Sequence, residues 1–113
     1  MTMNLPEPIA DFIEANALLD IDGMMKTFLH DAVFTDNGKD YTGQANIRQQ
    51  LEKEAIAVKA IFEPDTVREE DGDVVLEGPV HGEFPGSPLR FNYRFTLADD
   101  ADAIRMLEIA VWA

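Results

Sequence analysis

Residues 31–42 of the chain read DAVFTDNGKDYT, and this stretch sets the expected fold. Residues 32–36 are strand-like, and the Asn37-Gly38 pair that follows is the dipeptide that two-residue hairpin turns favour. A hairpin is therefore predicted, and because side chains alternate along a strand, every second residue points to the same face. The pairs predicted to share one face are Asp36 with Lys39 and Phe34 with Tyr41.

Helical patterns flank the hairpin. Pro6 suits the first turn of a helix whose apolar stripe has the i, i+3, i+4 spacing. Asp20 is a suitable N-cap for a second helix that ends near His30, and Thr42 for a third after the hairpin. The three stripes are Ile9, Phe12, Ile13, Asn16 and Ala17; Ile21, Met24, Met25, Phe28 and Leu29; and Ile47, Leu51, Ala55 and Val58.

From about Lys59 the spacing changes to that of strands. Pro64 cannot donate a backbone hydrogen bond, so the first of these strands needs an edge or a bulge there. Helices followed by a meander predict one α+β domain over residues 1–113, with three N-terminal helices packed on a strongly curved antiparallel sheet. The predicted strands are 59–69, 73–84, 89–98 and Ile104–Trp112.

A four-residue loop over 85–88 gives a register for the long hairpin. Phe84 then pairs with Leu89, and the glycines at 78 and 82 lie opposite aromatic residues. The other face is polar, and His81 lies there opposite Asn92. If that face lines a cavity, these two residues with Arg90 and Arg94 are pocket groups, and two arginines suit an acidic ligand. If it faces outward, they form surface ion pairs worth little.

Composition excludes several classes of function. The 9 basic and 22 acidic residues give a net charge of −13, which disfavours nucleic acid and anionic membranes as partners. No cysteine is present, so disulfides and thiolate chemistry are excluded, and the two histidines show no metal-ligand spacing. No signal peptide and no apolar run long enough to span a bilayer is visible, so the expected location is the cytoplasm.

The order of these motifs resembles a known family. A helix, the Asp20-Ile21-Asp22-Gly23 break, a second helix, the 31–36 strand and then residues 41–47 (YTGQANI) are similar to the SnoaL-like, polyketide cyclase-like branch of the nuclear transport factor two (NTF2-like) superfamily. The resemblance implies a cone-shaped α+β barrel, also described as cystatin-like, with a pocket between helices and sheet. It also implies a homodimer through the outer sheet face, since such dimers are common there.

Residue by residue, the resemblance carries over in part. Asp36 matches the general-base aspartate of ketosteroid isomerases in the superfamily. Their oxyanion tyrosine falls at Phe12, which has no hydroxyl, and their second aspartate falls near Arg90, of opposite charge. The aspartate that cyclases carry on the penultimate strand falls near Tyr93. Isomerase activity of that particular kind is therefore not expected.

Asp36 is the predicted catalytic residue, acting as a general base, although an aspartate before Asn-Gly is also an ordinary turn residue that Lys39 can pair with. No cofactor and no metal are predicted. We expect a cofactor-free isomerase, lyase or hydrolase for a small hydrophobic organic molecule. The alternatives are a non-catalytic ligand-binding or dimerisation module, or a protein–protein adaptor. The predicted ligand-binding residues are Phe12, Asn16, Phe34, Tyr41, His81, Asn92 and Tyr93.

Overall fold

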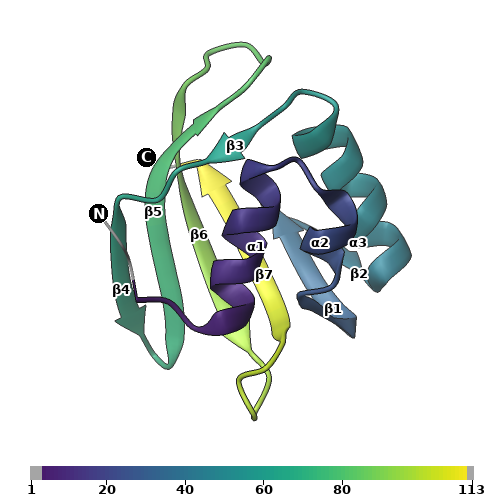
Figure 1. Ribbon diagram of the computed structural model, residues 1–113, viewed down its shortest axis with the longest axis vertical. Coiled ribbons are helices and arrows are strands. Elements are labelled where there is room, and N and C mark those ends of the chain that lie inside the picture. Colours follow the sequence, from purple (N-terminus) through teal and green to yellow (C-terminus); the bar gives the residue numbers. More distant parts are fainter. Residues whose placement is uncertain (1–3, 112–113) are drawn as a thin grey trace.

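The computed structural model describes residues 4–111 and confirms an α+β fold with three helices and a curled sheet (Figure 1). The third helix continues into one π-helical turn, η1. In chain order the elements are α1 (Glu7–Ala17), α2 (Ile21–Met25), β1 (Phe28–Asp36), β2 (Lys39–Thr42), α3 (Gln44–Leu51), η1 (Glu52–Ile56), β3 (Ile61–Phe62), β4 (Thr66–Glu70), β5 (Asp73–His81), β6 (Leu89–Leu97) and β7 (Ile104–Val111).

The strands form one sheet in the order β2-β1-β7-β6-β5-β3, and β4 also pairs with β5. Figure 1 shows this sheet curling around α1, with α2 and α3 beside it on the same side. The pairings are antiparallel as predicted, with one exception: β1 runs parallel to β7. The Asn37-Gly38 hairpin is confirmed with the predicted pairs, and it extends the sheet beyond the last strand.

The core lies between α1 and the concave face of the sheet. The Phe12 ring meets the rings of Phe28 and Phe95 edge to face, with 5.8 Å between centroids in both pairs. Phe62 stacks on Tyr93 with centroids 3.8 Å apart. Such pairs add to the stabilisation from burying apolar surface. Helix α1 is therefore held against the sheet by an aromatic layer, and Phe12 and Tyr93 of this layer also line the site described below.

The prediction for the second helix was wrong at its end. It placed Phe28 and Leu29 on the helix, but α2 stops at Met25 and β1 begins at Phe28. The Ile104 N–H donates to the carbonyl of Thr27, and Phe28 pairs with Ile104 of β7. Backbone bonds to the last strand therefore override the helical spacing, because a strand beside β7 must satisfy its own donors and acceptors.

Two further details depart from or refine the sequence pattern. Thr42 is the last residue of β2, and the N-cap of α3 is Gly43, whose φ of 83° lies in the left-handed region that favours glycine. The predicted interruption at Pro64 is confirmed, because it lies between β3 and β4. The predicted end of the last strand at Trp112 lies outside the described residues.

The register of the β5–β6 hairpin differs from the prediction by four residues. β5 ends at His81, and Val80 rather than Phe84 pairs with Leu89. The connection bends away at Gly82, where a Cβ would lie only 2.8 Å from the Val58 carbonyl oxygen. A shift by an even number keeps every side chain on its face, so the apolar, aromatic residues share one face as predicted. The structure shows that this is the inner face, because Tyr93 and Phe95 are buried. The predicted pairing of His81 with Asn92 is wrong, because His81 pairs with Ile61.

The polar face of the sheet points away from the helices and carries ion pairs. Arg90 forms a bidentate pair with Asp65, and Arg94 bonds Asp73 and Glu70. The predicted homodimer through this face stays a prediction. Within residues 4–111, the helices are too short or too polar to cross a bilayer.

Candidate functional site

A cavity of about 190 Å³ lies between α1, the α3–η1 segment and the inner face of the sheet. Most of its lining is apolar or aromatic, and the ionisable carboxylates on it belong to Asp36 and Glu54. Small-molecule sites typically combine an apolar lining with a few polar groups. The lining residues are Phe12, Asn16, Met24, Phe34, Asp36, Asn37, Leu51, Glu54, Ala55, Val58, Ala60, Val80, Phe84, Phe91, Tyr93 and Ile109.

Asp36 enters the cavity wall because it is the last residue of β1, on the same face as the buried Phe34. The Gln50 side-chain amide donates to Asp36 Oδ2 over 2.9 Å. Lys39, its cross-strand neighbour, lies over the Tyr41 ring instead, with Nζ 5.7 Å from the centroid. In the described part of the chain no cation pairs with Asp36, so the carboxylate is oriented by a neutral amide.

Tyr93 comes from β6 and belongs to the same lining. Burial raises the pKa of its hydroxyl well above the ordinary value, and the negative charge of Asp36 raises this pKa further. The hydroxyl is therefore neutral at any physiological pH and is able to donate a hydrogen bond. Tyr93 and Asp36 both line the cavity.

Asn16 is a buried polar residue whose two polar atoms are used by backbone groups. Its Nδ2 donates to the carbonyl of Ala60 over 2.9 Å, and its Oδ1 accepts from the N–H of Phe62 over 2.8 Å. These bonds fasten α1 to β3 and satisfy backbone groups that would otherwise be buried unpaired. Asn16 lines the cavity, and its hydrogen bonds hold the wall together.

The other predicted site residues divide into two groups. Phe12 and Phe34 line the cavity and are almost fully buried. Tyr41, His81 and Asn92 do not belong to the lining. The Tyr41 ring packs beside the Phe34 ring, and His81 and Asn92 lie on the outer face or edge of the sheet. His81 Nε2 lies 3.1 Å from Glu63 Oε1 in an exposed pair.

Sequence reasoning missed several residues of the site. Gln50 and Glu54 lie beside the predicted stripe of the third helix, and Glu54 is three residues after Leu51 and four before Val58. That spacing places it on the cavity side and was available from the sequence. Phe84 and Phe91 also line the cavity and are not among the predicted ligand-binding residues, although the pattern places both on the aromatic face of the hairpin.

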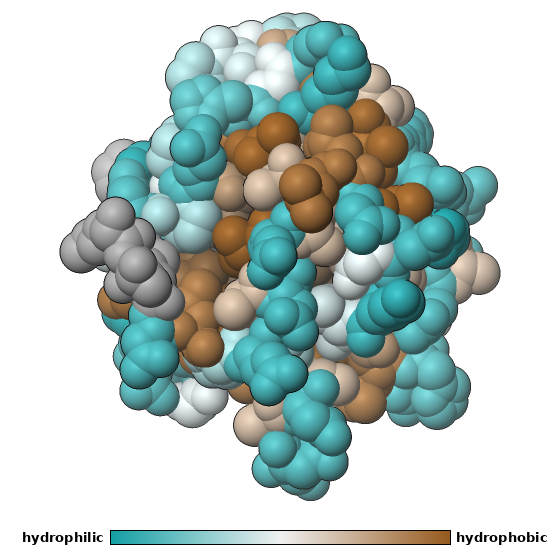
Figure 2. Space-filling model, in the orientation of Figure 1, coloured by the Kyte–Doolittle hydropathy of each residue, from teal (hydrophilic) through white to brown (hydrophobic). Residues whose placement is uncertain are grey.

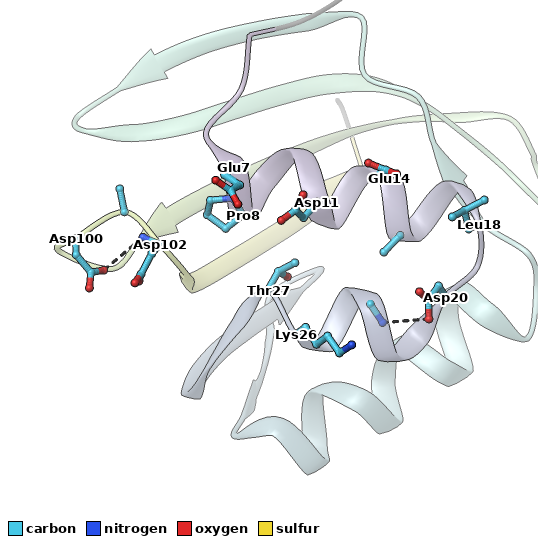
Figure 3. Close-up of a pocket in the computed structure, with 13 residues that line it drawn as sticks. Glu7, Pro8, Asp11, Glu14, Leu18, Asp20, Lys26, Thr27, Asp100 and Asp102 are labelled. Atoms are coloured by element: carbon cyan, nitrogen blue, oxygen red, sulfur yellow. Dashed lines mark hydrogen bonds between the residues drawn. The ribbon is translucent and has the colours of Figure 1, made fainter.

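A second, wider hollow lies outside the helices, between α1, α2 and the β6–β7 turn (Figure 3). Figure 2 shows hydrophilic side chains running over α1 down to that turn. Within residues 4–111, no group of three or more acidic or histidine side chains is arranged to hold a metal ion. The charged side chains of this acidic groove are exposed, so we interpret it as a hydrated surface. Its charged residues are Glu7, Asp11, Glu14, Asp20, Lys26, Asp100 and Asp102.

Several solved structures resemble this chain over almost its whole length. A Sinorhizobium meliloti protein provisionally assigned as a polyketide cyclase is 30% identical, with a TM-score of 0.84, over 94% of this chain and 95% of its own. A second protein, from Shewanella denitrificans, is provisionally assigned as a SnoaL-like polyketide cyclase. It is 17% identical with a TM-score of 0.73, over 94% of this chain and 88% of its own.

TerC, co-crystallised with polyporic acid, is 18% identical with a TM-score of 0.78, over 94% of this chain and 89% of its own. At this level of identity the similarity shows the fold alone. No protein-family model matches the chain, and neither does any curated protein.

Proposed function

Because this chain belongs to the SnoaL-like, polyketide cyclase-like branch of the NTF2-like superfamily, we propose that it binds a small organic molecule in the cavity and moves a proton on it with Asp36 as general base. The observation that carries the proposal is the position of the Asp36 carboxylate, which belongs to an apolar cavity and is oriented by Gln50.

The reaction we propose is the removal of a proton from carbon next to a carbonyl group, without a cofactor. A general base must lie within hydrogen-bond reach of the proton that it takes. Gln50 bonds Asp36 Oδ2, which leaves Oδ1 for the substrate. The neutral Tyr93 hydroxyl is the candidate donor to the substrate oxygen, on which negative charge develops as the proton leaves.

The exchange of ketone protons for deuterium tests this proposal directly. Wild-type protein is incubated in deuterated buffer with one-ring and two-ring ketones such as cyclohexanone and indanone, and proton NMR follows the α-protons. Asp36→Asn keeps the shape and the Gln50 contact but removes the base, so we expect exchange to slow about 100-fold or more. Asp40→Asn is the matched control, because Asp40 lies in the same hairpin outside the cavity lining.

Exchange at the wild-type rate in Asp36→Asn would remove Asp36 from the mechanism. A second candidate function, ligand binding without chemistry, is favoured by Phe12, which brings no hydroxyl to the cavity, and by Asn16, whose polar atoms already serve Ala60 and Phe62. Ligand binding that survives in Asp36→Asn, with no exchange in either protein, would support this alternative.

A further inference from the structure

The cavity carries charge of one sign. Asp36 from the end of β1 and Glu54 from η1 are its ionisable carboxylates, and among residues 4–111 no lysine, arginine or histidine belongs to its lining. Lys59, just beyond the lining residue Val58, has its Nζ 3.4 Å from Glu83 Oε2 and is exposed. An anionic ligand in this cavity would therefore meet two negative charges and no free positive one.

Glu54 is positioned by the shape of its helix. The segment Glu52–Ile56 is a π-helical turn, in which the Ala57 N–H donates to the Glu52 carbonyl and the Ala60 N–H to that of Ala55. The Glu54 side chain is exposed, whereas the neighbouring Ala55 is half-buried against the core. Glu54 is therefore a charged group at the entrance of the cavity, and changing it leaves the core intact.

The volume of the cavity limits the size of the ligand. An apolar cavity of about 150 Å³ in another protein takes up benzene. A cavity of about 190 Å³ therefore suits one ring with a short substituent, about ten non-hydrogen atoms. Three fused rings exceed that volume.

We propose that this cavity selects neutral or cationic one-ring molecules, and that Asp36 with Glu54 rejects carboxylates of the same shape. Glu54 is then a specificity-determining residue. The inference rests on the proposed function only in taking the cavity as the ligand site, because it concerns binding and not proton transfer.

Three probes with one skeleton test the selection by charge: para-ethylbenzyl alcohol, para-ethylbenzylamine and para-ethylbenzoate, with anthracenemethanol as the oversized probe. Titration calorimetry at pH 7 gives the dissociation constants. We expect the alcohol and the amine to bind at least about tenfold more tightly than the carboxylate, because like charges near an apolar wall repel strongly. Anthracenemethanol should not compete with the alcohol.

The Glu54→Gln variant tests the residue itself, and Glu52→Gln is its matched control. Both lose one carboxylate from the same exposed turn, but only Glu54 belongs to the cavity lining. We expect Glu54→Gln to tighten carboxylate binding about threefold or more relative to Glu52→Gln and to weaken amine binding, while alcohol binding changes less than twofold.

Three outcomes would overturn the inference: a carboxylate that binds as tightly as the alcohol, equal effects of Glu54→Gln and Glu52→Gln, or no binding of alcohol and amine at millimolar concentration. Failure of the proton-transfer proposal is a separate result, because the ketone experiment then shows no dependence on Asp36 while these affinities keep their order.

Discussion

The cavity and the acidic groove lie on opposite sides of α1. Both contain carboxylates, but the surroundings of these carboxylates differ. In the cavity, the half-buried Asp36 carboxylate belongs to an apolar, aromatic lining, and the exposed Glu54 carboxylate lies at the edge of that lining. In the groove, a larger number of carboxylates faces water beside Lys26 (Figure 3). Water screens charges strongly, whereas an apolar wall does not. The number of acidic residues is therefore a poor guide to a site, and their surroundings are a better one.

The two faces of α1 should differ most in how much an apolar side chain contributes to the stability of the protein. Phe12 is 1% exposed and contacts two other aromatic rings, so Phe12→Ala should cost about 3–5 kcal/mol of unfolding free energy and enlarge the cavity. Leu18, 72% exposed and lining the groove, is the control, and Leu18→Ala should change stability by less than about 0.5 kcal/mol. Urea unfolding of both variants measures the difference, and equal losses would contradict it.

Polar residues on the two faces of α1 should show a smaller difference in stability when they are replaced. Asn16→Ala leaves the Ala60 carbonyl and the Phe62 N–H without partners, which should cost about 2–4 kcal/mol. Glu14→Ala on the groove side should stay within about 0.5 kcal/mol. Hydrogen exchange offers a local check, because the Phe62 amide should lose protection in Asn16→Ala and keep it in Glu14→Ala. A protected Phe62 amide in the first variant would show that another group satisfies it.

The smallest of the expected effects is a change in the pKa of one carboxyl group in the groove. Asp100 raises the pKa of the Asp102 carboxyl by a hydrogen bond to its protonated form and by charge repulsion. Asp100→Asn removes the charge, so the pKa of Asp102 should fall toward its ordinary value of about 3.9. Carbon-detected NMR titration of the carboxyl groups measures this shift. An unchanged pKa would mean that the two side chains do not interact in solution.

Local chemistry explains what the sequence predicted well. The Asn37-Gly38 turn fixes the hairpin, and with it Asp36 and Phe34 on the inner face, because a two-residue loop leaves one register. The helical stripe of α1 likewise placed Phe12 and Asn16 on the cavity side. These predictions depend on residues that are close in sequence, where turn type and helical period decide the geometry.

Contacts between distant segments explain the errors. Phe28 matches a helical stripe, and only its pairing with Ile104 of β7 makes it a strand residue. The seven-residue connection over 82–88 depends on the close approach of Gly82 to Val58, which a hairpin pattern does not reveal. The cavity was predicted as a pocket, but Glu54 was missed because the pattern of the helix marked its buried stripe and not the residues at its rim.

The parallel pairing of β1 with β7 has a consequence for the order in which the molecule folds. Asp36 pairs with Ile109, so β1, which is made early, must wait for β7 to emerge from the ribosome. Contacts of such large sequence separation slow folding, and the waiting hairpin has an unpaired edge that a stray chain can occupy. Asp36, at the end of β1, gains these surroundings only after β7 has been made, so a chain that stops before β7 carries the aspartate without its site.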